Sequence, residues 1–316
     1  MKSKKTLVSY VELDEEDLAK LREYAEVYTP SSRGFEDAKG EAEIALSVVL
    51  QPGEVKKLKR LEFLQTISAG VDSLPWSMIP EKVVVCGNMG SNADAVAEHA
   101  WALLLAAAKR LHHYMPNVKN GDFSQKTETL QLRGRTLCVV GMGSIGRKVA
   151  EVGKAFGMRV IGVTRSGSSS IEVDRVVGPE GLDEALRESD FVVLSAPLTK
   201  HTRGLIGLNR LRMLKKRCVL VNIGRAELVD REALLTYLRE NPEAVVATDV
   251  WWNVKLGDKW ETELINYPNF IGTPWVAGGF GSPEIFSRMK QAAVENIIRY
   301  LSGQKPINIV DRSDYV

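Results

Sequence analysis

The sequence has few of the features that mark cross-linked, membrane-spanning or nucleic-acid-binding proteins. Its only cysteines, Cys86, Cys138 and Cys218, lie far apart without a CxxC pair, which argues against a disulfide framework or a zinc site and favours a reducing, cytoplasmic location. The longest apolar run, residues 100–108, is too short to cross a bilayer, and the start of the chain lacks the apolar core of an export signal. A formal net charge of +2 gives no general attraction to nucleic acid or membrane surfaces.

The composition is that of a folded protein with more than one domain. Hydrophobic residues make up 44% of the chain and charged residues 26%, which excludes global disorder. The length of 316 residues exceeds the roughly 100–200 residues usual for one domain. In the first 90 residues, short β-rich runs alternate with charged amphipathic stretches, a pattern typical of βα units with parallel strands.

A change of pattern follows at residues 91–94. Ser91 and Asp94 form an S-x-x-D helix start, and the apolar stretch behind them predicts one long helix reaching about Met115. Residues 116–134 are polar and contain turn residues, so they are expected to form a loop or arm. A second βα series begins with a strand at 136–140, a helix and a strand at 159–163, and a long helix over 282–303 closes the chain.

Between that strand and helix lies a glycine-rich turn, Gly141-Met142-Gly143-Ser144-Ile145-Gly146. In a strand-turn-helix context Gly141 permits the tight turn, Gly143 lets a pyrophosphate approach the backbone, and Gly146 lets the helix pack on the strand. The anion would then bind the N–H groups at the helix N-terminus, where Ser144 and Ile145 lie. The turn predicts a dinucleotide site; the alternative is a structural glycine turn.

The end of the second strand of this unit bears on the choice of cofactor. NAD-binding units usually place Asp or Glu there to hold the ribose hydroxyls, but this chain has Thr164, Arg165, Ser166 and Ser168. A guanidinium can pair bidentately with a 2′-phosphate, and the hydroxyls can donate to it. NADP is therefore expected in preference to NAD, although NAD remains possible and Arg165 could instead be a solvated loop residue.

Several segments together resemble the D-2-hydroxyacid dehydrogenase family, which includes glyoxylate, hydroxypyruvate and phosphoglycerate dehydrogenases. The segments are ISAGVDSL (67–74), NADAVAEHA (92–100), LRGRTLCVVGMGSIGRKVA (132–150), SAPLTKHTRGLIG (195–207), VNIGRAELVDREAL (221–234), TDVW (248–251) and TPWVAG (273–278). The resemblance implies an α/β fold of two Rossmann-like domains with parallel sheets. A dinucleotide-binding domain at 98–283 would be inserted into a flavodoxin-like substrate domain formed by 1–97 and 284–316, and members are typically homodimers.

The resemblance also implies the residues of the reaction site. Arg225 matches the catalytic arginine that grips the carboxylate and carbonyl oxygen of a small 2-oxo or 2-hydroxy acid, a task suited to its planar fork of donors. The alternative for Arg225 is a surface arginine that caps a loop. Ala69, Gly70 and Val71 match a loop whose backbone N–H groups help to hold the carboxylate. Further residues match positions that line the cofactor: Ser195, Pro197, Ile223 and Asp249.

The chain departs from the family where the acid–base pair should be. Trp275 stands at the position of the histidine and Val254 at that of its partner glutamate. An indole N–H donates a hydrogen bond but does not titrate usefully. General acid–base catalysis is typically worth ~10²–10⁴-fold, so its loss slows turnover without excluding it. Among histidines, His99 is the first candidate for a replacement acid, followed by His112 and His113; each is otherwise a structural or interface histidine.

Two functions follow from this pattern. One is an NADPH-dependent reductase of a small 2-oxo acid such as glyoxylate or hydroxypyruvate, supported by Arg225 within the family's motifs. The other is a dinucleotide-binding sensor or partner protein with weak or absent catalysis, supported by Trp275 and Val254. The residues Trp251, Trp252 and Trp275 could line a substrate pocket, as expected for Trp275 beside the substrate, or pack in the core. We expect the reductase.

Overall fold

The computed structural model describes residues 4–252 and 262–316. The chain divides into unit 1, Met1–Asn92 with Ser282–Val316, and unit 2, Ala93–Gly281. The boundaries therefore lie at 92/93 and 281/282, where the resemblance implied 97/98 and 283/284. Within the described residues no helix combines the length and apolarity that a membrane span requires.

Unit 1 contains a five-stranded parallel sheet with the order β2-β1-β3-β4-β5, which is the flavodoxin-like order. Its strands are β1 Lys5–Ser9, β2 Ala25–Tyr28, β3 Ile44–Ser47, β4 Phe63–Thr66 and β5 Val84–Cys86. Its helices are α1 Glu15–Tyr24, α2 Phe35–Ala38, α3 Pro52–Val55, α11 Pro283–Leu301 and the 3₁₀ turns Trp76–Met78 and Arg312–Asp314.

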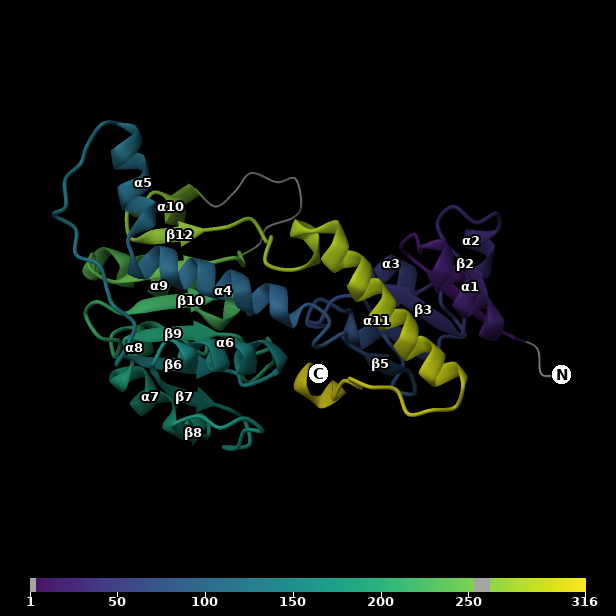
Figure 1. Cartoon of the computed structure of the whole chain (residues 1–316). Coiled ribbons are helices and arrows are strands. Elements are labelled where there is room, and N and C mark those ends of the chain that lie inside the picture. The colour runs from purple at the N-terminus through teal and green to yellow at the C-terminus, as the bar shows by residue number, and fades with distance from the viewer. Residues whose placement is uncertain (1–3, 253–261) are drawn as a thin grey trace. The chain divides into compact units, whose positions relative to one another are not determined.

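Both faces of this sheet are buried because successive side chains of a strand point to opposite faces. In β1, Leu7 packs into a core with side chains of α1 and α11, and its neighbour Val8 packs into a second core on the other face. Figure 1 shows the yellow α11 running across the unit 1 sheet. The Ser282 hydroxyl caps this helix by accepting from Ile285 N, and the C-terminal end of the sequence thereby completes a domain that the N-terminal end begins.

Unit 2 contains a seven-stranded parallel sheet with the order β12-β11-β10-β9-β6-β7-β8. Its strands are β6 Thr136–Val140, β7 Arg159–Val163, β8 Arg175–Val177, β9 Phe191–Leu194, β10 Val219–Asn222, β11 Val245–Thr248 and β12 Phe270–Gly272. Its helices are α4 Ala93–Ala108, α5 Leu111–Lys119, α6 Ser144–Ala155, α7 Leu182–Glu188, α8 Leu208–Leu211, α9 Arg231–Glu240 and α10 Thr262–Ile265. Three 3₁₀ turns, Pro179–Gly181, Ala226–Leu228 and Gly279–Gly281, complete the unit.

Helices cover both faces of this sheet, as a doubly wound fold requires. In β6, Leu137 and Val139 face a core shared with α4 and α6, whereas Cys138 and Val140 face the core of α7 and α9. The strand order reverses between β6 and β9, where β6 lies beside both β7 and β9. Ligands of open parallel sheets bind at the carboxyl ends of strands at such a reversal.

The expectation of one long helix from about residue 93 to 115 is wrong. α4 ends at Ala108, and Arg110 adopts a left-handed backbone conformation with φ 54°, which α-helix geometry does not tolerate. A second helix, α5, then runs through Lys119, into the stretch expected to be a loop. The expected start motif also does not form, because α4 begins at Ala93 and the Ser91 hydroxyl donates to Asn88 O instead.

Candidate active site

The glycine turn after β6 has the close approaches that exclude side chains at two of its positions. Gly141 has φ 97°, and a Cβ there would lie 2.5 Å from Ala196 N. A Cβ on Gly146 would collide with Gly141 O and lie 2.8 Å from Ser195 Oγ. At Gly143 a Cβ would meet nothing within 4 Å, so this position faces open space. The fold therefore requires glycine at Gly141 and Gly146, whereas Gly143 keeps space clear in front of α6.

The N-terminus of α6 suits an anion. The helix begins at Ser144, and Gly143 at its N-cap offers no side-chain hydrogen bond to the first turn. The N–H groups of that turn, to which Ser144, Ile145 and Gly146 belong, are therefore available to a ligand. Ser195 supports the turn from the neighbouring strand end, because its hydroxyl donates to Gly141 O at 2.7 Å. These features fit the pyrophosphate of a dinucleotide.

A cleft of about 420 Å³ opens beside this turn. Seven of the residues expected from the sequence line it: Gly141, Gly143, Thr164, Arg165, Ser166, Ser168 and Pro197. The buried hydroxyl of Thr164, at the end of β7, has no hydrogen-bond partner within the described part of the chain. Buried polar atoms normally have partners, so this oxygen marks a place where a ligand hydroxyl fits.

The cleft also contains residues that the sequence did not single out. His201 lines it, and Leu182 and Leu205 contribute apolar walls. Ile223, expected beside the cofactor, is buried directly after β10. The apolar walls are spread over several elements, so no local motif in the sequence marks them, although such walls are usual where an adenine binds.

Arg225 lies in the turn after β10, at the carboxyl end of the unit 2 sheet. Asn222 holds this turn, since its amide donates to Arg225 O at 2.8 Å and its oxygen accepts from Gly224 N at 3.2 Å. Arg225 Nη1 donates to Gly224 O at 2.9 Å, and the residue is half-buried. The backbone of Arg225 is therefore fixed by buried groups, as a group that positions a substrate requires.

The expected carboxylate loop lies in unit 1, after β4. Ser68 Oγ donates to Gly70 O at 2.9 Å, and Trp76 Nε1 donates to Val71 O at 2.9 Å. Ala69 and Gly70 are half-buried and Val71 is buried. The carbonyl groups of Gly70 and Val71 are thus engaged internally, and the backbone N–H groups of the loop are the polar atoms suited to an incoming carboxylate.

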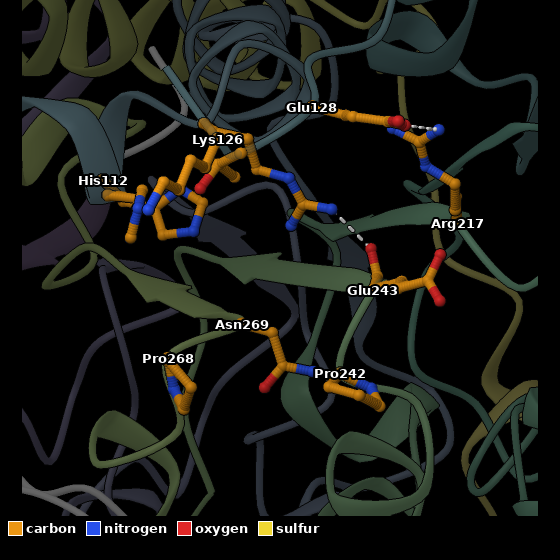
Figure 2. A pocket seen from close by; sticks show the side chains of 11 residues that line it. His112, Lys126, Glu128, Arg217, Pro242, Glu243, Pro268 and Asn269 are labelled. Atoms are coloured by element: carbon orange, nitrogen blue, oxygen red, sulfur yellow. Dashed lines mark hydrogen bonds and ion pairs between the residues drawn. The ribbon is translucent and has the colours of Figure 1, made fainter. Parts of the chain in front are cut away.

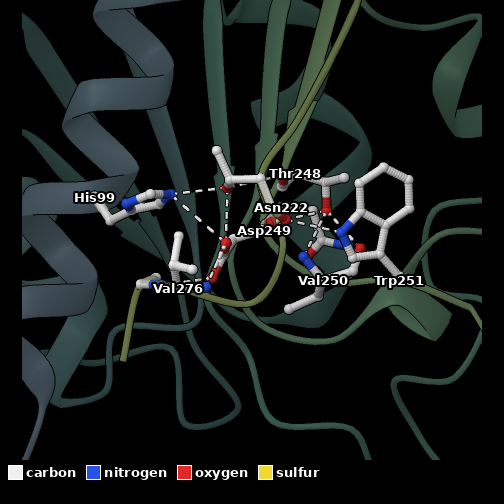
Figure 3. A network of polar contacts seen from close by, with 9 residues as sticks. His99, Asn222, Thr248, Asp249, Val250, Trp251 and Val276 are labelled. Carbon is white, nitrogen blue, oxygen red and sulfur yellow. Dashed lines mark hydrogen bonds and ion pairs between the residues drawn. The ribbon is translucent and has the colours of Figure 1, made fainter. Parts of the chain in front are cut away.

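A polar network in unit 2 joins α4 to the segment that carries Trp275 (Figure 3). His99 Nε2 lies 2.9 Å from Thr273 Oγ1 and 3.6 Å from Asp249 Oδ1. Thr273 Oγ1 donates to Asp249 Oδ1 at 2.7 Å. Asp249, only 2% exposed, also accepts from Val276 N at 3.0 Å and Ala277 N at 2.8 Å. Asp249, expected beside the cofactor, therefore fixes the segment 273–277.

Trp275 lies in the segment 273–277 that this network fixes. It has a left-handed backbone, φ 61°, and is 38% exposed, whereas non-glycine residues rarely adopt that conformation. Trp251 and Trp252 are core residues, 8% and 9% exposed, whose indole N–H groups donate to Thr273 O and Val229 O. The open choice between pocket and core is settled as core for these two. Val254 lies outside the described residues.

The comparisons with known proteins agree with this arrangement. Residues 101–277 match the family model described as "D-isomer specific 2-hydroxyacid dehydrogenase, NAD binding domain". The chain belongs to this family. The glyoxylate reductase of Aeropyrum pernix is 36% identical over 262 residues, which span 80% of this chain and 77% of the relative. The glyoxylate reductase of Thermococcus kodakarensis is 31% identical over 263 residues, with the same shares of 80% and 77%.

A solved structure is similar over nearly the whole chain. The crystal structure of a candidate formate dehydrogenase from Pyrobaculum aerophilum is 40% identical, covers 98% of this chain and 100% of its own, and has a TM-score of 0.88. The family resemblance and the fold class are thereby confirmed, and unit 2 contains the dinucleotide-binding domain of a family of 2-hydroxyacid dehydrogenase enzymes. The family's cofactor is a nicotinamide dinucleotide.

Proposed function

We propose that the protein reduces a small 2-oxo acid of the glyoxylate or hydroxypyruvate type to a D-2-hydroxy acid. The observation that carries this proposal is Arg225, which is held in a fixed turn at the carboxyl end of the sheet that also carries the glycine turn. A guanidinium binds a carboxylate bidentately and can donate to the neighbouring carbonyl oxygen. Backbone N–H groups of Ala69, Gly70 and Val71 would complete the hold on the carboxylate.

The cofactor in this proposal is NADPH, which supplies the hydride. Arg165 would pair with the 2′-phosphate, with Thr164, Ser166 and Ser168 as hydroxyl donors in the same cleft. No carboxylate stands among residues 164–168 to repel that phosphate or to favour the ribose hydroxyls of NADH.

The proton for the product hydroxyl must come from a group other than Trp275. His99 is the histidine that contacts the segment carrying Trp275, through Thr273, and it is held near the carboxylate of Asp249. A histidine oriented by a carboxylate is suited to proton transfer. We assign His99 to this task, and expect a rate below that of an enzyme with a direct histidine acid.

The test is oxidation of NADPH by the purified protein at high enzyme concentration, with a panel of 2-oxo acids. We expect turnover with glyoxylate or hydroxypyruvate that disappears in Arg225→Ala, which also controls for a contaminating reductase. Arg225→Lys keeps the charge but loses the fork, and should retain part of the activity with a raised KM. Turnover equal in wild type and Arg225→Ala would refute the proposed role of Arg225.

A second candidate function is the oxidation of formate. It is favoured by the 40% identity to the candidate formate dehydrogenase together with tryptophan at the expected acid position. In this reaction the hydride leaves formate for the oxidised nicotinamide and carbon dioxide forms, so no proton is transferred and no acid is needed. Arg225 would bind formate through the same fork. Formation of NADPH from NADP⁺ and formate, without oxidation of NADPH by 2-oxo acids, would select this function.

The same experiment covers the binding-protein alternative. NADPH that binds tightly but reacts with neither substrate class would identify a dinucleotide-binding sensor or partner protein. We also expect a homodimer in the cytoplasm, which light scattering and localisation of the tagged protein would check.

A further inference from the structure

A second cleft, of about 480 Å³, lies in unit 2 and shares no lining residue with the dinucleotide cleft. Its walls come from the α4–α5 junction, from residues 126–128, and from the segments that precede β10, β11 and β12. It therefore lies where those strands begin. The glycine turn and Arg225 follow the carboxyl ends of their strands. Because the sheet is parallel, the second cleft lies at the other side of it, at the amino ends of the strands.

Arg110 is the buried cation of this cleft. Its left-handed backbone turns the chain between α4 and α5, and the residue is 8% exposed. Its Nη2 donates to a backbone carbonyl, Glu243 O, at 2.5 Å, and no carboxylate in the described residues lies within ion-pair distance. Burial, and secondarily the charge of Arg217, lower the pKa of Arg110. Buried charges are normally paired with an opposite charge; here the charge of Glu243 on the cleft wall partly offsets the shift, without an ion pair to Arg110 in the described residues.

The other charged groups leave the cleft short of negative charge. Figure 2 shows Lys126, Glu128, Arg217 and Glu243 around the same space. Glu128 pairs with Arg217 at 2.5 Å, and Glu243 pairs with Lys216, outside the lining, at 2.6 Å. Lys126 makes no ion pair with any residue that the structure describes. Both carboxylates thus have ion-pair partners, whereas Arg110 and Lys126 have none among the described residues.

Two histidines, His112 and His113, add possible hydrogen-bond donors to the cleft. His112 Nδ1 is buried and has no hydrogen-bond partner among the described residues. Burial and then the charge of Arg110 lower the pKa of His112, while backbone hydrogen bonds with Ala106 and Pro268 oppose the shift. His113 lines the same wall. An anion in the cleft would offset the repulsion from Arg110 and could accept from His112.

We propose that this cleft binds a small oxyanion, a phosphate or carboxylate group, at a site separate from the reaction. The recognising groups are the guanidinium forks of Arg110 and Arg217, the ammonium of Lys126 and the ring of His112. A planar or tetrahedral oxyanion accepts from two guanidinium donors at once, and its charge compensates the buried cation. The cleft volume admits an anion larger than a single phosphate, such as a phosphorylated small molecule or a dicarboxylate.

Sulfate is the probe for the test, because it is a divalent oxyanion that does not titrate near neutral pH. The melting temperature of the full chain is measured against sulfate, with sodium chloride at matched ionic strength and NADPH present to occupy the glycine turn. A ligand of the native state raises the melting temperature in a saturable manner. We expect that behaviour for wild type, and a roughly tenfold higher apparent dissociation constant in Lys126→Ala, because each charged hydrogen bond is worth about one such factor.

Matched variants keep the outcome specific to the cleft. Arg217→Gln should weaken sulfate binding like Lys126→Ala, whereas Lys119→Ala removes an equal charge from the exposed end of α5 and should leave it unchanged. All variants share the glycine turn, so an anion held there cancels in the comparison. Equal sulfate response in wild type and Lys126→Ala overturns the proposal. A wild-type melting temperature that does not respond to sulfate beyond the sodium chloride control also overturns it.

Discussion

At the scale of single residues, Trp275 limits the chemistry of the site that we propose. It stands two residues after Thr273, whose hydroxyl joins His99 to Asp249, so the segment is held as firmly as one that carries a catalytic group. The indole can donate a hydrogen bond to a substrate oxygen but cannot deliver a proton. Stabilisation of that oxygen by Arg225 and Trp275 together, without direct acid catalysis, accounts for a slow reductase or for a reaction that needs no proton.

Trp275→His separates these two readings. His is among the residues that tolerate a left-handed backbone better than Trp, so the variant should fold, which a melting curve checks. If the protein is a reductase, kcat for glyoxylate should rise at least tenfold and by no more than ~10⁴-fold, the upper end of what general acid catalysis supplies. Formate oxidation should not gain from the change. A folded variant with unchanged glyoxylate reduction would mean that residue 275 does not face the reacting oxygen.

The proposed preference for NADPH rests on a single residue, Arg165. Arg165→Ala should weaken NADPH binding by roughly 10–100-fold, the range of one or two charged hydrogen bonds, while NADH binding changes by less than about threefold. Fluorescence titration of both cofactors measures the two constants, and Ser166→Ala serves as a milder neighbour control. Equal affinity of the wild type for NADH and NADPH would contradict the assignment of Arg165 to a 2′-phosphate.

At the scale of elements, the glycines of the turn from β6 into α6 differ in what they contact. Gly146 contacts Gly141 O and Ser195 Oγ so closely that a methyl group cannot fit, whereas Gly143 faces open space. The turn therefore contains two glycines that the packing needs, Gly141 and Gly146, and one, Gly143, at which a side chain would meet no neighbour.

A matched pair of alanine variants tests this division. Gly146→Ala should destabilise the protein by about 1–3 kcal/mol, the usual cost of overpacking. Gly143→Ala should fold with an unchanged melting temperature, because its backbone, φ −74° and ψ −163°, suits alanine, yet it should bind NADPH at least tenfold more weakly. Denaturant unfolding and cofactor titration give the two readouts. Normal NADPH binding by Gly143→Ala would remove the phosphate from this turn.

How well the sequence predicts an element depends on how local its causes are. β6 and β7 are found at their expected bounds because continuous β-rich runs flank a glycine turn that only one geometry satisfies. The break after Ala108 was not predictable, since Lys109 and Arg110 are good helix formers and no glycine marks the left-handed residue. β8 was also missed, because Arg175–Val177 is short and only partly buried. β8 lies at the edge of the sheet and pairs only with β7, so its own residues show no pattern of burial.

The candidate site divides in the same way. The glycine turn and the loop around Arg165 are each a continuous stretch of sequence, and residues of both line one cleft. The contact of His99 with Thr273 joins positions 174 residues apart, and the second cleft draws its lining from several separate segments. Through-space clusters of that kind leave no spacing signature, so only the structure brings them together.

At the scale of the whole molecule, two parallel sheets present every expected reaction loop at the carboxyl end of a strand. Residues 69–71 follow β4 in unit 1, and Gly141, Ser195 and Arg225 follow β6, β9 and β10 in unit 2. This is the general location of ligand sites in open α/β sheets. In the sequence, unit 2 is inserted between the two parts of unit 1.

The buried thiols give a pH prediction for the molecule as a whole. Burial raises the pKa of Cys86 to about 11 and that of Cys138 to about 12, above the ~8.5 of an unfolded thiol. A raised folded-state pKa gives stability that is complete below pH ~8.5 and lost as the pH rises towards 11. Denaturant unfolding should therefore show a free energy that falls between pH 8.5 and 11, with a shallower fall in Cys86→Ala. Identical slopes in the two proteins would contradict this.

The central claim, that this chain transfers a hydride to a 2-oxo acid held by Arg225, is tested most directly by a single-turnover experiment. Enzyme in excess is mixed with NADPH deuterated at both C4 positions and with glyoxylate, and the glycolate formed is analysed by mass spectrometry. The account predicts glycolate that carries one deuterium on C2, at a rate reduced at least a hundredfold in Arg225→Ala. Bound NADPH with no deuterated glycolate, or deuterated glycolate formed equally well by Arg225→Ala, would contradict it.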